Sequence, residues 1–112
     1  MAEYDFNIKQ GADWSWELSG FENDISNDTF LMQIRAEKDK TSTLILDVSP
    51  FFTKTTDTLL CKVPFSETGL LDFSKSHYDL FHVDTQDNVV ELLSGCVFME
   101  KQITDIDSGE GQ

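Results

Sequence analysis

Basic residues are scarce in this sequence: eight Lys and Arg stand against 21 Asp and Glu, which gives a formal net charge of −13 at pH 7. Proteins that bind a phosphate backbone or an anionic membrane do so mainly through Lys and Arg. The composition therefore argues against direct binding to nucleic acid or to a membrane. A solvated acidic coat is the commonest reason for such a charge; a basic protein partner, cation binding and imitation of DNA are the alternatives.

Cysteine is also scarce. Cys61 and Cys96 stand without a CxxC pair or a neighbouring His, which favours two buried thiols over a metal or redox site. The N-terminal stretch MAEYDFNIKQ is mixed rather than apolar, and no apolar run approaches the roughly 20 residues that cross a bilayer. We therefore expect a protein that is made and kept in a cytosol, or assembled from it, and that has no cofactor.

Apolar bulk is what the sequence has in quantity. Hydrophobic residues make up 39% of it, and nine Phe contribute most of the 12% that are aromatic. This is enough to order a chain of 112 residues around one core, and the length is too small for two cores. We predict a single domain over residues 1–104, followed by a flexible acidic tail over residues 105–112, DIDSGEGQ.

Apolar and polar residues alternate along most of the chain, which is the pattern of half-buried strands. YDFNIKQ and DWSWELS alternate around a tight QGA turn, so we expect them to form two neighbouring strands. Two hairpins are also predicted, one from TFLMQIRAE and TLILDVS and one from HYDLFHVDT and NVVELLSGCVFMEK. About seven to eight short strands predict an all-β antiparallel sandwich, with at most one short helical turn near residues 66–72.

Residues 88–101, NVVELLSGCVFMEK, form the longest nearly uncharged stretch, and bulky side chains occupy both of its faces. Such a strand suits the centre of a sheet, and Gly95 within it predicts a β-bulge. Its second face is a possible contact surface for another subunit, as is the adjacent Phe pair of SPFFTK. The candidate interface residues are Phe51, Phe52, Leu93, Val97 and Met99.

Trp14 and Trp16 are two residues apart, so they share one face of a predicted strand. Trp in an alternating strand usually belongs to the core, and this is the favoured interpretation. If that face were open to water, the two rings would offer a platform on which a carbohydrate could stack. Trp14 and Trp16 are therefore also candidate sugar-binding residues.

Signatures of catalysis and of metal binding are weak. His77 and His82 are five residues apart in one predicted strand, so their rings should point to opposite faces of the sheet. Cys61 has no motif that links it to a His, and neither DTQDN nor DIDSGE supplies the EF-hand pattern. We expect no catalytic residues, no metal site and no enzymatic activity.

Four short motifs occur in a definite order: QGAD at residues 10–13, QIR at 33–35, YDL at 78–80 and LLSGCV at 92–97. Together they make residues 4–104 similar to a family of small virion proteins of tailed bacteriophages. The resemblance implies an immunoglobulin-like β-sandwich, similar in style to the N-terminal domain of upper baseplate proteins, and no catalytic residues. This chain departs from the family pattern at Asn27, Asp28 and Glu91 and has heavier residues at Trp14 and Trp16, which leaves the partner surface open.

The expected function is that of a non-enzymatic structural or assembly protein of a bacteriophage virion, in the tail, the baseplate or the fibre attachment. Its expected partners are other virion proteins, with further copies of the chain as one option. Its expected location is the virion, after synthesis in the bacterial cytoplasm. An acidic inhibitor that imitates DNA against a host nucleic-acid-binding protein is the first alternative, and a carbohydrate-binding sandwich is the second.

Overall fold

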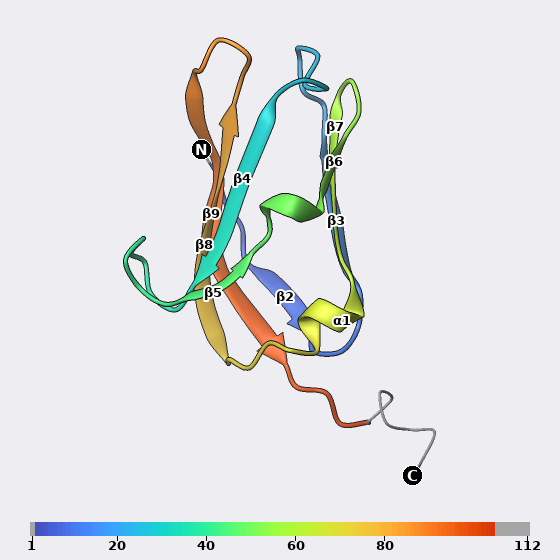
Figure 1. Ribbon diagram of the computed structural model, residues 1–112, viewed down its shortest axis with the longest axis vertical. Helices are drawn as coiled ribbons and strands as arrows, with labels where there is room; N and C mark the ends of the chain where they lie inside the picture. Colours follow the sequence, from blue (N-terminus) through green and yellow to red (C-terminus); the bar gives the residue numbers. More distant parts are fainter. Residues whose placement is uncertain (1, 105–112) are drawn as a thin grey trace.

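The computed structural model describes residues 2–104, which form two β-sheets packed face to face (Figure 1). The elements are, in order, β1 (Ala2–Glu3), β2 (Phe6–Lys9), β3 (Trp14–Ser19), β4 (Thr29–Arg35), β5 (Leu44–Asp47), the 3-10 turn η1 (Ser49–Phe51), β6 (Phe52–Lys54), β7 (Thr58–Val63), the helical turn α1 (Phe65–Thr68), β8 (Lys75–Val83) and β9 (Val89–Glu100). The predicted tail, residues 105–112, lies outside the described residues.

The larger sheet contains six strands in the order β1-β9-β8-β4-β5, with β2 also paired to β9. The smaller sheet contains three strands in the order β3-β7-β6. The predicted all-β sandwich is therefore confirmed, and so are the β4–β5 and β8–β9 hairpins. The central position predicted for β9 is also confirmed, because β9 pairs with β8 on one side and with β1 and β2 on the other.

The two strands at the start of the chain are not neighbours, although their sequences predicted a hairpin. β2 runs parallel to β9 in the larger sheet, whereas β3 pairs antiparallel with β7 in the smaller one. Between them, Gly11 adopts a φ of +84°, which glycine tolerates best, and the Ala12 amide donates to the Lys9 carbonyl at 3.1 Å. The turn thus carries the chain from one sheet to the other. Because β1 and β2 are parallel to β9, the larger sheet is mixed rather than purely antiparallel.

Two short helical turns connect the sheets. α1 confirms the turn expected near residues 66–72, with bounds shifted slightly towards the N-terminus. η1 is an addition that the sequence patterns did not predict, and it leads the chain from β5 in the larger sheet to β6 in the smaller one (Figure 1). Pro50 suits this position, because the first turn of a helix needs no amide hydrogen from that residue.

Gly95 does not form the predicted bulge. The irregularity in the β8–β9 pairing lies at Leu92 instead. Leu80 is opposite Leu93 and Phe81 is opposite Glu91, so Leu92 has no residue opposite it on β8. Gly95 instead lies beneath the link between β1 and β2, and a Cβ atom at this position would stand 2.3 Å from the carbonyl oxygen of Tyr4. The Tyr78 hydroxyl donates to this oxygen at 2.6 Å. Gly95 therefore allows the N-terminal segment to pack against β9.

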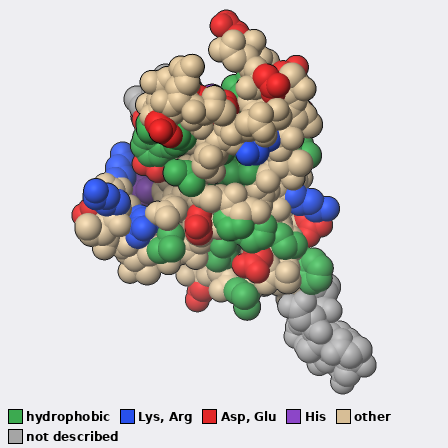
Figure 2. Space-filling view, turned by 45° about the horizontal axis from the view of Figure 1, so that its top comes forward, with side chains coloured by type: hydrophobic (Ala, Val, Ile, Leu, Met, Phe, Trp, Pro, Cys, Tyr) green, Lys and Arg blue, Asp and Glu red, His purple; other side chains and the backbone are tan. Residues whose placement is uncertain are grey.

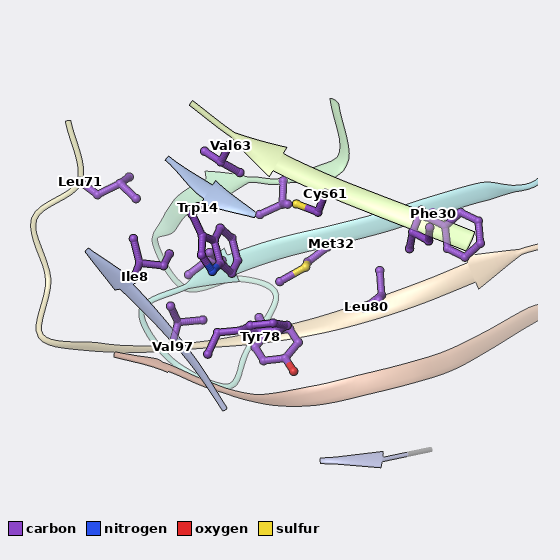
Figure 3. Close-up of a cluster of buried hydrophobic side chains, with 14 of the residues drawn as sticks. Ile8, Trp14, Phe30, Met32, Cys61, Val63, Leu71, Tyr78, Leu80 and Val97 are labelled. Atoms are coloured by element: carbon purple, nitrogen blue, oxygen red, sulfur yellow. The ribbon is translucent and has the colours of Figure 1, made fainter. Parts of the chain in front are cut away.

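The core fills the space between the two sheets (Figure 3). Most of its side chains come from alternate positions of the strands, as the period of two in the sequence predicted. The most deeply buried apolar residues are Ile8, Ile25, Met32, Ile34, Val48, Leu59, Cys61, Val63, Leu80 and Val97, each at most 1% exposed. The smaller sheet thus covers the inner face of the larger one and leaves the outer face of each sheet to solvent.

The QGAD motif ties three segments together at the end of the sandwich near α1. The Gln10 side chain donates to the Leu71 carbonyl at 2.7 Å and accepts from the Gln102 amide at 3.0 Å. The buried Thr68 hydroxyl donates to the Ala12 carbonyl at 2.8 Å and accepts from the Gly11 amide at 3.2 Å. These contacts give the motif a structural role, since its polar groups are used within the chain.

Replacing Thr68 by Val tests this connection. Val has nearly the same shape but no hydroxyl, so the Gly11 amide and the Ala12 carbonyl would lose their side-chain partner inside the protein. We expect a loss of about 2 kcal/mol in the free energy of unfolding, measured by urea denaturation. Thr68→Ser, which keeps the hydroxyl and removes one methyl group, should cost about 1 kcal/mol or less. Equal losses in the two variants would contradict this role of the hydroxyl.

Candidate interaction face

The outer face of the larger sheet carries the most varied set of exposed side chains. Cross-strand pairing arranges them in rows along β8, and four rows that span β4, β8 and β9 follow the pair Lys75–Phe98 at the start of this strand. The row at His77 contains Arg35 and Cys96, and the next contains Gln33, Asp79 and Ser94. Beyond these, Leu31, Phe81 and Glu91 form a third row, and Thr29, Val83 and Val89 form a fourth. One half of the face is therefore polar and the other half is largely apolar.

We call Leu31, Phe81, Val83 and Val89 the outer apolar patch. Leu31 is 47% exposed and Val89 is 62% exposed, while Phe81 and Val83 are half-buried. Directly opposed side chains in an antiparallel pair lie about 5 Å apart, so Leu31 lies beside Phe81, and Val83 lies beside Val89. The four side chains form one continuous apolar surface over three neighbouring strands.

A hollow of about 540 Å³ adjoins the patch on the polar half of the face. Its floor comes from β8 and β9, one wall from the link between β1 and β2, and the other wall from β4 and the loop that follows it. Six carboxylate side chains line the hollow against three basic ones, Arg35, Lys38 and Lys40. Figure 2 shows Lys and Arg side chains beside a His at the left edge of the molecule, the side on which Figure 1 places the β4–β5 loop.

His77 and Cys96 meet on the floor of the hollow. The Sγ atom of Cys96 lies 3.8 Å from Nδ1 of His77, and the two residues are directly opposite each other in the β8–β9 pairing. The Cys96 amide donates to Oδ1 of Asp5 at 3.0 Å, which fixes the backbone beneath the thiol. Both cysteines are free thiols, and Cys96 is the more accessible of the two because Cys61 is fully buried.

The walls of the hollow are held by side chains that bind one another. Nη1 of Arg35 donates to the Ser42 carbonyl at 2.7 Å, and its Nη2 donates to Oε1 of Gln33 at 2.8 Å, so the β4–β5 loop is tied to the strand before it. In that loop, the Thr41 amide donates to the Asp39 carboxylate and lowers the pKa of Asp39. On the floor, burial raises the pKa of Asp79 above its usual value.

Three of the candidate interface residues on β9 are not free to meet a partner. Val97 is fully buried and Met99 is 9% exposed, and both face the smaller sheet as part of the core. Leu93 is half-buried and packs against the same core. Leu93, Val97 and Met99 share one face of β9, as the alternation in the sequence predicted. This face is the inner one, so the interface hypothesis for Val97 and Met99 is wrong.

Phe51 and Phe52 are both half-buried and pack against the core. They do not point to opposite faces of one strand, because η1 ends at Phe51 and β6 begins at Phe52. The Phe52 ring lies 5.8 Å from that of Trp16 and 6.4 Å from that of Phe30. These contacts give Phe52 a role in joining the sheets.

Trp14 and Trp16 both lie on the inner side of the smaller sheet. Trp14 lies among the core side chains (Figure 3) and is 7% exposed, and its ring packs edge-on against that of Phe6 with centroids 5.2 Å apart. Trp16 is half-buried between Phe6 and Phe52. Among the described residues, its buried indole Nε1 has no hydrogen-bond partner. The two rings are therefore core residues, and they present no open platform for a sugar.

The two histidines face opposite sides of the larger sheet, as their spacing predicted. His77 is on the outer face, whereas His82 stacks on the Phe30 ring on the inner side with centroids 4.6 Å apart. Nε2 of His82 lies 2.7 Å from Oδ2 of the buried Asp28. This pair anchors the loop before β4. Neither the contact of His77 with Cys96 nor the outer apolar patch was anticipated from the sequence.

No protein-family model matches the sequence, and no curated protein matches it either. Within residues 2–104, no helix is long and apolar enough to cross a membrane. In the same part of the chain, no three His, Cys, Asp or Glu side chains are grouped so that they could hold a metal ion.

Proposed function

We propose that the protein is a non-enzymatic structural component of a tailed-bacteriophage virion, in the tail, the baseplate or the fibre attachment, and that it joins larger parts by protein–protein contacts. The observation that carries the proposal is the outer apolar patch. Leu31 and Val89 are exposed and Phe81 and Val83 are half-buried beside a polar hollow, and an apolar centre with a polar rim is the usual composition of a protein interface. The order of the QGAD, QIR, YDL and LLSGCV motifs supports the phage origin.

The partner that fits this face is a different protein of the particle rather than a second copy of the chain. Two copies that each carry a formal charge of −13 repel each other, and the repulsion is strongest at low ionic strength. A neighbour with a less acidic surface meets no such penalty. The apolar patch would then supply most of the affinity, while the charges around the hollow would select the partner.

The first test is whether the chain is present in purified particles. Antibodies against the recombinant protein should detect it in virions banded on a density gradient. Disrupted particles are then passed over the immobilised protein, and the retained protein is identified by mass spectrometry. The expected result is one of the structural proteins of the same particle. Absence of the chain from purified virions, or retention only of host nucleic-acid-binding proteins in a salt-sensitive manner, would overturn the proposal and favour the inhibitor.

A pair of matched variants tests the outer apolar patch. Leu31→Gln removes an exposed apolar side chain from the patch, and Leu60→Gln removes one that is 43% exposed on the smaller sheet. We expect Leu31→Gln to weaken binding to the retained virion protein by about 10- to 100-fold, because burying a Leu contributes roughly 1.5–3 kcal/mol. Leu60→Gln should change the dissociation constant less than about twofold. Isothermal titration calorimetry measures both, and equal effects would contradict the assignment of the interface.

A further inference from the structure

The thiol of Cys96 has the surroundings of a reaction site rather than those of a packing residue. Its sulfur is 3.8 Å from Nδ1 of His77, within contact range of a base, and both groups line the hollow of about 540 Å³. A thiol becomes an effective nucleophile when a neighbouring base takes its proton. Cys61 provides the contrast within the same chain, because it is fully buried and does not line the hollow.

The charges around this pair favour a particular kind of reactant. Six carboxylates line the hollow, Glu3 and Asp5 before β2, Glu37 and Asp39 in the β4–β5 loop, Asp79 on β8 and Glu91 on β9. Arg35, Lys38 and Lys40 offset half of them, which leaves the lining net negative. An anionic reactant is therefore repelled from the thiol, whereas a cationic one is attracted.

We propose that Cys96 and His77 form a thiol-exchange site that takes a small, positively charged disulfide. Nδ1 of His77 accepts the proton of the Cys96 thiol, and the thiolate attacks one sulfur of the disulfide. The disulfide bond breaks, a mixed disulfide forms between Cys96 and one half of the reactant, and the other half leaves as a thiolate that takes up a proton. The Cys96 sulfur is oxidised and the leaving sulfur is reduced, so the exchange needs no further oxidant.

Three symmetric disulfides of similar size test the charge preference on the native protein. They are cystamine, which is cationic, bis(2-hydroxyethyl) disulfide, which is neutral, and 3,3′-dithiodipropionate, which is anionic. The rate at which each disulfide modifies the protein is divided by the rate at which the same disulfide reacts with N-acetylcysteine methylamide, a small neutral thiol. This ratio removes the intrinsic reactivity of the disulfide. We expect cystamine to react about 10-fold faster than the anionic reagent at low salt, and the ratio to fall at high salt. Mass spectrometry should find one modified thiol per native chain, at Cys96.

His77→Gln tests the role of the base. At pH 7 we expect it to slow the modification of Cys96 by about 10-fold with all three disulfides, and to shift the rise of the rate to higher pH. Lys75→Gln is the matched control, because Lys75 is on the same face of β8 but does not line the hollow. It should leave the rates within about twofold of the native ones.

The inference is overturned if Cys96 reacts no faster than Cys61, if His77→Gln reacts at the native rate and with the native pH profile, or if the anionic disulfide is as fast as cystamine after normalisation. The comparison of the three disulfides uses the unmodified chain, so it remains decisive if His77→Gln does not fold. Circular dichroism of each variant shows whether the sandwich is retained.

Discussion

Raising the pH from 9 to 12 is expected to destabilise the sandwich by up to about 4 kcal/mol through one buried thiol. Burial raises the pKa of Cys61 from 9.0 to about 12. The unfolded chain therefore releases this proton at lower pH than the folded chain does. The contribution of the neutral thiol to stability is complete below pH 9 and is lost progressively as the pH rises towards 12. Burial also raises the pKa of Tyr78 above its ordinary value of 10.0, so this second group begins to act in the same direction above about pH 10.

Urea denaturation between pH 7 and pH 11 measures this effect. Cys61→Ala removes the buried thiol and should cost about 1–2 kcal/mol at pH 7, because it leaves a small cavity in the core. Its stability should then fall less steeply above pH 9 than that of the native protein. Cys96→Ala, which removes the partly exposed thiol, is the control and should retain the steep alkaline decrease. Parallel curves for Cys61→Ala and the native protein would show that the buried thiol does not cause it.

Substitution of Gly95 by Ala is expected to lower the free energy of unfolding by about 3 kcal/mol. The new Cβ atom would stand 2.3 Å from the Tyr4 carbonyl oxygen, so the link between β1 and β2 must move away from β9. This movement also stretches the 2.6 Å hydrogen bond from the Tyr78 hydroxyl to the same oxygen and the 2.9 Å bond from the Tyr4 amide to the Ser94 carbonyl. The atom nearest to the new Cβ belongs to the backbone rather than to a flexible side chain, so a change of rotamer cannot relieve the clash.

Gly20→Ala is the matched control for Gly95→Ala. Gly20 has a φ of +86°, which disfavours a side chain, but a Cβ atom added there would meet no other atom within 4 Å. It should therefore cost only about 1–2 kcal/mol, from the backbone conformation alone. Hydrogen exchange provides a second measurement, because Gly95→Ala should expose the Tyr4 amide while Gly20→Ala leaves it protected. A cost for Gly95→Ala no larger than that for Gly20→Ala would contradict the close approach.

Local patterns predicted the strands well because alternation records which face of a strand is buried. Phe6 and Ile8 on β2, and Met32 and Ile34 on β4, are buried as their spacing indicated. The partner of β2 could not be predicted in the same way. A strand with one apolar face fits either sheet, and its pairing with β9 depends on residues about 90 positions away in the sequence.

The contact between His77 and Cys96 could not be predicted from the sequence, because it depends on one extra residue in β9. Val83 is opposite Val89 near the turn, and His77 is opposite Cys96 farther from it. His77 is six residues from Val83 along β8, whereas Cys96 is seven residues from Val89 along β9, so β9 has one extra residue between the two pairs. Without the irregularity at Leu92, His77 would be opposite Gly95, and the thiol would lie on the other face. Leu92 carries no sequence signal of its own, since bulges are favoured by context as much as by residue type.

The outer apolar patch could have been predicted from the sequence of β8. Phe81 and Val83 alternate with Leu80 and His82, so apolar residues occupy both faces of β8 just as they do in β9. Bulk on both faces was instead attributed to residues 88–101 alone. An antiparallel strand with one solvated face is usually polar on that face, so Phe81 and Val83 were the residues that broke the rule.

The parallel pairing of β1 and β2 with β9 bears on how the chain acquires its structure during synthesis. Residues 2–9 leave the ribosome well before residues 93–100, the part of β9 with which they pair. The N-terminal strands therefore wait unpaired while the rest of the sandwich is synthesised, and contacts of such long range slow folding. Until β9 arrives, β8 also presents an open edge to other chains. Completion of β9 is thus the event that closes the larger sheet, and a chain interrupted before Gly95 has neither its central strand nor a place for its N-terminus.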